Sequence, residues 1–431
     1  MSSPKINLTN GRFKYIDEEL TSPIPVDYSN INATVTDFDL KTTIVNLHIE
    51  DLSLNSQTGY EITDLKGDFH YETDAMWLND FVMETPHSYL EGDISTDISG
   101  GKMSEFTELV EINAAFAKAR VSTNDINTFY NGFNDDIILN LKGGMIGTLN
   151  DFKTKNLRLS GLKNSKVEGD ISFKNLLNDK EIIIDGNYKD VITSHDDLKE
   201  LMPEILSALP KELTKLEEIS FKGENRVTIT DITTKGTFIT ALGDAEVDLT
   251  LSNYLDTEEA TYKGQVALEA FDLGKFINDK KVGKASVNFE VDGKGFTQES
   301  LNTKLSGEVA SMSYNGYNYH DIMISGDLSE PKFNGELHID DPHIKGDFNG
   351  LIDVSKAIHN YDFTATIDHL DLNALHFVKD SVSIIKGDVV MDMRGTGIED
   401  AKGVINFKNM SYQTMVAVSY THLTLPTILL V

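Results

Sequence analysis

The sequence predicts a mainly β protein: a long antiparallel sheet with one apolar face, and one or two short helices near residues 195–218. Three observations predict this fold. Apolar and polar residues alternate at a period of two, turn dipeptides that contain glycine recur at short intervals, and helical periodicity is scarce. Apolar residues make up 40% of the chain, which is enough for a folded core.

Alternation at a period of two places the apolar side chains on one face of a strand. The clearest runs are 45–50, 245–252 and 285–292. The side chains expected on the apolar face of these runs are Val45, Leu47, Ile49, Ala245, Val247, Leu249, Leu251, Ala285, Val287, Phe289 and Val291. They are the candidate residues of a functional apolar surface.

Asn-Gly and Asp-Gly dipeptides, which are favoured in two-residue hairpins, occur between or within such runs. They lie at 185–186, 292–293, 315–316, 334–335 and 349–350. Strands that are joined by tight turns pair antiparallel, because parallel pairing needs long crossover segments that the chain lacks. The expected topology is therefore an antiparallel meander.

One segment, 195–218, has helical spacing instead. Its spaced apolar residues are Leu198, Leu201, Met202, Ile205 and Leu209. Ser194 is expected to cap the first turn, and Pro203 and Pro210 to kink the helix or split it in two. The segment is expected either to act as a lid or plug at one sheet edge, or simply to pack over the sheet.

The chain is strongly acidic, with 38 Lys and Arg against 69 Asp and Glu and a formal net charge of −31. This balance excludes nucleic acid as an expected partner and argues against docking on anionic membrane surfaces, because both are bound by clustered basic residues. The chain has no cysteine, so disulfides and thiolate metal sites are excluded. An acidic chain is well solvated, which suits a protein that carries exposed apolar area.

No catalytic, cofactor-binding or metal-binding residues are predicted, and an enzyme is not expected. The densest set of candidate metal ligands is His338, Asp340, Asp341 and His343, but a tight turn at Asp-Asp-Pro-His explains the same residues. No phosphate loop, zinc-protease motif or nucleophile elbow occurs in the sequence.

Four segments, taken in this order, resemble the TamB/AsmA-like family of bacterial envelope proteins, and the Bacteroidetes-type translocation and assembly module protein TamB in particular. They are FDLGKF followed by GKASVNFEVDGKG (271–295), YNGYNYHDIMISG (314–326), LHIDDPHIKGDFNGLID (337–353) and TATIDHLDLNAL (364–375). The resemblance is diffuse and covers nearly all of 5–414. None of the segments is a catalytic signature.

The resemblance implies an internal segment of a protein that is anchored in the inner membrane and crosses the periplasm. The long twisted sheet would curl into an open trough with an apolar interior that conducts phospholipid acyl chains, with the candidate residues facing the lipid. A role in outer-membrane biogenesis and protein assembly would involve an outer-membrane partner of the BamA/TamA type, which docks through parts missing from this chain.

The expected organisation is an extended β body over 1–194, a helical insertion at 195–218 and a continuation of the body over 219–417. Residues 418–431 resemble translated sequencing-adapter readthrough and are expected to be non-native; the alternative is a genuine apolar strand. The second functional reading is a surface-exposed β adhesin or passenger-like interaction protein, which shares the alternation, the acidity and the lack of cysteine. It is less favoured because the chain lacks near-identical repeats.

Overall fold

The computed structural model divides into two units, which are described separately. Unit 1 comprises Met1–Leu209 and Glu218–Ile229, and unit 2 comprises Pro210–Glu217 and Thr230–Val431. The residues that the structure describes are 1–15, 26–57, 59–100, 105–128, 132–178, 180–203, 211–297, 299–329, 331–355, 357–379, 382–396 and 400–414.

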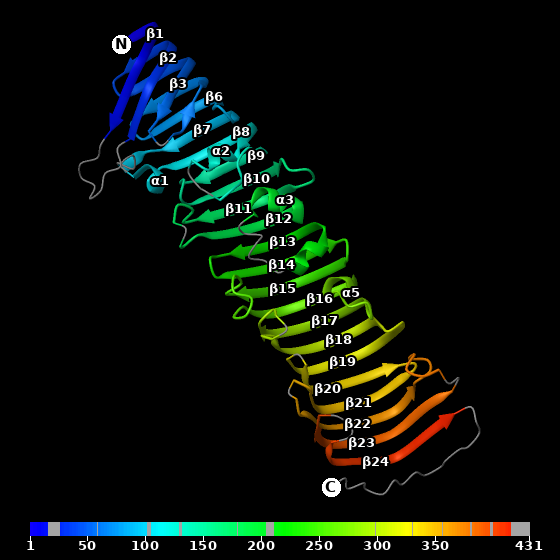
Figure 1. Cartoon of the computed structure of the whole chain (residues 1–431). Coiled ribbons are helices and arrows are strands. Elements are labelled where there is room, and N and C mark those ends of the chain that lie inside the picture. Colours follow the sequence, from blue (N-terminus) through cyan, green and yellow to red (C-terminus); the bar gives the residue numbers. More distant parts are fainter. Residues whose placement is uncertain are drawn as a thin grey trace. The chain divides into compact units, whose positions relative to one another are not determined.

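Unit 1 is an antiparallel sheet with three short helices among its described residues (Figure 1). Its strands are β1 (Ser2–Tyr15), β2 (Val26–Lys41), β3 (Ile44–Ser56), β4 (Glu61–Ile62), β5 (Asp64–Glu72), β6 (Ala75–Glu84), β7 (Tyr89–Asp97), β8 (Glu111–Ser122), β9 (Ile138–Gly147), β10 (Phe152–Ser160), β11 (Lys166–Lys174), β12 (Ile183–Ser194) and β13 (Glu218–Val227). Its helices are α1 (Phe106–Leu109), α2 (Thr123–Ile126) and α3 (His195–Leu201).

Unit 2 is built in the same way. Its strands are β14 (Asp231–Thr240), β15 (Gly243–Ser252), β16 (Thr261–Asp272), β17 (Val282–Lys294), β18 (Asn302–Tyr314), β19 (Tyr317–Ser329), β20 (Lys332–Asp341), β21 (Ile344–Asp353), β22 (His359–Asp371), β23 (Ser383–Gly395) and β24 (Lys402–Thr414). Its described helices are the 3₁₀ helix η2 (Lys211–Leu216) and α5 (Leu273–Ile277).

Within each unit, strands pair antiparallel in chain order. In unit 1 the two-residue β4 pairs with the end of β3, while β3 also pairs with β5. In unit 2 the pairing runs without interruption from β14 to β24. The prediction of a mainly β, antiparallel meander is confirmed, whereas short helices also occur outside the predicted segment 195–218, at α1, α2 and α5.

Neither unit has the strongly curled shape that the family resemblance implies. In the described residues no pairing joins β1 to β13 or β14 to β24, so neither sheet closes on itself. Figure 1 shows no strong curl within either unit. Each sheet is open, and its two faces remain distinct.

The turn predictions are wrong for four of the five glycine dipeptides, because 185–186, 292–293, 334–335 and 349–350 lie inside β12, β17, β20 and β21. Only Asn315-Gly316 forms a turn, between β18 and β19. In β17, Gly293 pairs with Tyr262, and a Cβ atom on Gly293 would lie 2.7 Å from Tyr262 Cε2. Glycine is thus placed here to accommodate the aromatic ring of a paired residue, which the sequence pattern does not distinguish from a turn.

The helical prediction for 195–218 is confirmed at α3 and η2. The chain passes from unit 1 to unit 2 within this segment, returns to unit 1 at Glu218, and passes to unit 2 again between Ile229 and Thr230. Ser194 caps α3 as predicted, since its hydroxyl accepts a hydrogen bond of 3.1 Å from the amide of Asp197. The helix ends at Leu201, before Pro203. Ile205, Leu209, Pro210 and the predicted non-native tail at 418–431 lie outside the described residues.

Replacing Gly264 with alanine is expected to lower the free energy of unfolding by about 1–3 kcal/mol, the cost of a strained backbone conformation. Gly264 has a φ of +143°, and a Cβ atom there would lie 2.0 Å from the carbonyl oxygen of Asp248 on β15. Urea titration followed by circular dichroism measures the loss. The adjacent Gln265→Ala variant, on the exposed face, is the control and should change stability by about 0.5 kcal/mol or less. Equal stability of the two variants would refute the expectation.

Candidate functional site: the apolar sheet face

Rows of apolar side chains run across the strands of unit 2. Two central rows pass through the predicted residues. One flanking row passes through Ala245 and Val287, and another passes through Leu251. These four rows together are called the apolar face of unit 2. One central row is Val247, Val266, Phe289, Gly307, Ile324, Leu337, Phe348, Ala365, Val389 and Phe407. The other is Leu249, Gly264, Val291, Leu305, Gly326, Gly335, Gly350, Phe363, Met391 and Ile405.

Most of the predicted residues in unit 2 are half-buried, although they lie in the interior of paired strands. This group is Ala245, Val247, Leu249, Leu251, Val287, Phe289 and Val291. Ala285 differs: it pairs with Phe271 and is 1% exposed, at the end of β17 near α5. A packed core would bury such side chains fully, so the half-buried group is available to a further apolar partner.

The predicted residues of unit 1 lie on one face of β3. Val45 and Leu47 are half-buried, whereas Ile49 is 6% exposed. Val45 pairs with Tyr71 and Leu47 with Phe69, so aromatic side chains of β5 extend this face. Because Ile49 and Ala285 are buried by the protein itself, we leave them out of the surface that a ligand could reach.

Aromatic rings line part of the apolar face of unit 2. The ring centroids of Phe333 and Phe348 are 6.2 Å apart, and those of Phe348 and Phe363 are 5.1 Å apart. These residues lie on three consecutive strands, β20, β21 and β22. Contacts at these centroid separations stabilise neighbouring strands and leave ring surface for other apolar groups.

The opposite face of unit 2 is polar and carries ion pairs between adjacent strands. Lys235 Nζ lies 2.6 Å from Asp248 Oδ2, and Lys263 Nζ lies 2.8 Å from Asp292 Oδ2. A shallow hollow of about 780 Å³ has a mixed lining, in which polar residues such as Glu290 and His338 lie beside Ile324 and Phe348 of the apolar face.

One end of the apolar face is covered by a turn, residues 372–377, that follows β22. Leu375 of this turn is fully buried and packs with Val309, Tyr319 and Ile322 of β18 and β19. The turn therefore reaches back from β22 over β21 and β20. Asp371 holds its first residues, since Asp371 Oδ1 accepts hydrogen bonds of 3.1 Å from the amides of Asn373 and Ala374.

Aspartate side chains also fix the start of other short helices that follow strands. In unit 2, Asp272 ends β16 and its Oδ1 accepts a hydrogen bond of 3.1 Å from the amide of Lys275 in α5. In unit 1, Asp197 of α3 is 2% exposed and accepts a hydrogen bond of 2.7 Å from the hydroxyl of Ser165. In the sequence, Asp272 and Asp371 are each followed by a leucine.

Asp341 is a fully buried carboxylate at the end of β20. Its Oδ1 accepts hydrogen bonds from the Tyr317 hydroxyl (2.6 Å) and the His343 amide (2.8 Å), and its Oδ2 accepts one from the His320 amide (3.0 Å). This network fixes the turn between β20 and β21 against β19. The tight-turn prediction for residues 340–343 is confirmed.

The network predicts a loss of stability at high pH. Burial, and then the hydrogen bond to Asp341, raise the pKa of the Tyr317 hydroxyl above its ordinary value of 10.0. The unfolded chain therefore loses this proton first, so the free energy of unfolding should fall as the pH rises above about 10. Urea titrations at about pH 8 and pH 11 measure the fall. Tyr317→Phe, which has no hydroxyl to titrate, should show a smaller fall; an equal one would contradict the assignment.

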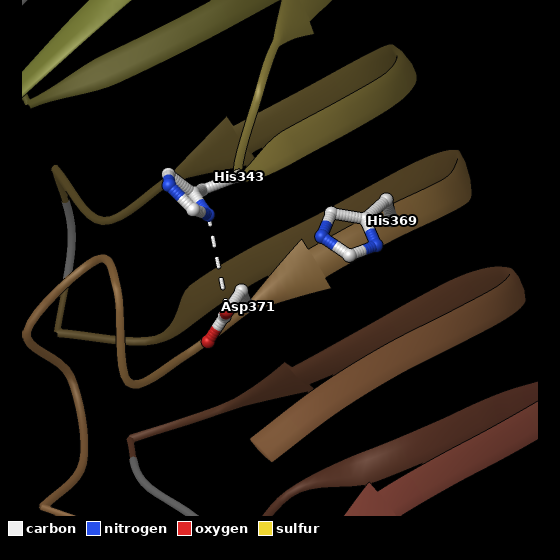
Figure 2. A group of neighbouring side chains, drawn as sticks. All are labelled: His343, His369 and Asp371. Atoms are coloured by element: carbon white, nitrogen blue, oxygen red, sulfur yellow. Dashed lines mark ion pairs between the residues drawn. The ribbon is translucent and has the colours of Figure 1, made fainter. Parts of the chain in front are cut away.

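The four candidate ligands at 338–343 do not converge. His338 Nδ1 lies 2.7 Å from Asp347 Oδ1, Asp340 pairs with Lys345 at 2.5 Å, and Asp341 is engaged as described. Instead, the fold brings His343 beside His369 and Asp371 (Figure 2). Nothing in the sequence marks this group, because its members become neighbours only through the pairing of β21 with β22.

No protein-family model, curated protein sequence or solved structure matches the chain. No helix in the described part of the chain is long and apolar enough to cross a bilayer.

Proposed function

We propose that the apolar faces of the two units bind the acyl chains of phospholipids, in a segment of a bacterial envelope protein that conducts phospholipid between the inner and outer membranes. The observation that carries the proposal is the set of half-buried apolar rows from β15 to β24. Each acyl methylene that leaves water for such a surface contributes about 0.8 kcal/mol. A chain of about a dozen methylenes would thus be held by many weak contacts and no single residue.

The chemistry of the opposite face fits this role. Its paired acidic and basic side chains keep one side of unit 2 solvated, and the net charge of −31 opposes self-association. Acyl chains need no polar partner, which agrees with rows that contain glycine and hydrocarbon side chains. We place the activity in the periplasm, with an outer-membrane partner of the BamA/TamA type and a role in outer-membrane biogenesis, on the resemblance of the sequence alone.

The test is to express the chain in a bacterial periplasm, purify it in mild detergent, and identify extracted lipid by mass spectrometry. About one phospholipid or more per chain, absent from a similarly acidic control protein purified in parallel, supports the proposal. A lipid-free, monodisperse and soluble protein would contradict it. That result would favour the second reading, a β adhesin or interaction protein whose apolar face is covered by another protein.

A further inference from the structure

Three potential metal ligands meet where β20, β21 and β22 approach one edge of unit 2. His343 lies in the turn before β21, and His369 and Asp371 lie at the end of β22. The amide of Asp371 donates a hydrogen bond of 2.9 Å to the carbonyl oxygen of His343, which sets the two residues side by side. Alternation along β22 places His369 on the same side of the strand as Asp371.

The separations suit one bound ion. One nitrogen of each imidazole and one carboxylate oxygen all lie within 4.8 Å of one another, and His343 Nδ1 is 3.8 Å from Asp371 Oδ2. Ligand bonds of about 2.0–2.2 Å at tetrahedral angles set ligand atoms about 3.4 Å apart, so small side-chain rotations would complete the geometry. Figure 2 shows the three side chains grouped at the ends of neighbouring strands.

The surroundings of the three residues favour metal binding. The amides of Asn373 and Ala374 donate hydrogen bonds to Asp371 Oδ1, which leaves Oδ2 for a metal. These hydrogen bonds also orient the carboxylate, as groups that surround metal ligands commonly do. Among the described residues, His369 forms no side-chain hydrogen bond, so its ring is available. The side chains of His343 and Asp371 are 45% and 23% exposed, so an ion can reach them from solvent.

We propose that His343, His369 and Asp371 bind one divalent ion of the Zn²⁺ type, with a fourth coordination position open to water or another ligand. Two imidazoles and one carboxylate are a donor set that suits Zn²⁺ better than Mg²⁺ or Ca²⁺, which prefer all-oxygen sites. The bound ion also fixes the 372–377 turn, because Asp371 both ligates the metal and caps that turn. The site stands independently of the proposed lipid function.

The experiment measures Zn²⁺ binding to the full chain by isothermal titration calorimetry, with excess Mg²⁺ present to occupy non-specific acidic sites. One Zn²⁺ per chain is expected, and Co²⁺ should give the visible absorption of a tetrahedral site. His369→Ala and Asp371→Asn should each weaken binding by about tenfold or more. His338→Ala, which removes an exposed histidine paired with Asp347, is the matched control and should bind as the unaltered chain does.

A second readout separates loss of the ligand from loss of the fold. Zn²⁺ should raise the thermal midpoint of the unaltered chain and of His338→Ala, and should not raise that of His369→Ala. Asp371→Asn retains an oxygen to cap the 372–377 turn, so it should fold and still lose the metal. Absence of stoichiometric binding in the unaltered chain overturns the proposal, and so does equal affinity in all variants.

Discussion

Asp341→Ala should lower the free energy of unfolding by about 3 kcal/mol or more, the largest effect that we expect from one substitution. The change removes the buried acceptor of three hydrogen bonds and leaves the Tyr317 hydroxyl and two backbone amides, all partly buried, without that partner. Each unsatisfied buried donor costs about 1–3 kcal/mol. Chemical denaturation followed by near-UV circular dichroism reports the loss, because three tyrosines, 314, 317 and 319, lie around the affected cluster.

Asp347→Ala is the matched control for this substitution. The carboxylate of Asp347 is 64% exposed and pairs with His338, so its removal should change stability by about 0.5 kcal/mol or less. If both variants unfold at the same denaturant concentration, the Asp341 network does not stabilise unit 2. Tyr317→Phe should fall between them, since it removes one of the three hydrogen bonds and keeps the ring.

Leu249→Lys and Val287→Asp should each reduce the phospholipid that is recovered with the protein by about tenfold. A charge on the apolar face must either stay hydrated or be buried without a partner. Excluding even two acyl methylenes from the surface costs about 1.6 kcal/mol, which corresponds to about tenfold in binding. Extraction and mass spectrometry of bound lipid, or transfer between donor and acceptor vesicles, measures the effect.

Asn288→Lys is the control for the charged variants. Asn288 neighbours Val287 in the chain but belongs to the opposite, polar face, where it is paired with Glu308. Val287 packs against the core cluster around Leu375, so Val287→Asp can also weaken folding. Leu249 is not part of that cluster, so Leu249→Lys tests lipid binding separately from it. Equal lipid recovery from all three variants would exclude the apolar face as the lipid-binding surface.

Alternation in the sequence was sufficient to predict which side chains share a face. It placed Val247, Leu249 and Phe289 on the apolar side of unit 2, because a period of two has only two solutions once the strand exists. It did not locate the strand ends. Glycines such as Gly293 are read as turns because both turns and aromatic cross-strand contacts favour a residue without a side chain.

The candidate metal group could not be predicted from spacing. His343 lies 26 residues before His369 in the sequence. The two become neighbours because the register of β21 on β22 sets Lys345 opposite His369 and includes an irregularity before Gly346. The buried network of Asp341 could be predicted only in part. The turn at Asp-Asp-Pro-His was predicted, but the hydrogen bond from Tyr317 was not.

The pairing of strands in chain order has a consequence for how each unit folds. Each strand pairs with the strands just before and after it in the chain. Because the segments that join paired strands are mostly short, the loop-closure entropy lost in each pairing is small. Folding can then begin at any hairpin and spread from strand to strand, as in repeat proteins whose stability is a sum of nearest-neighbour terms. Amide hydrogen exchange rates should therefore differ from one hairpin to the next. A destabilising substitution should speed exchange in the strands next to it, while distant hairpins stay protected.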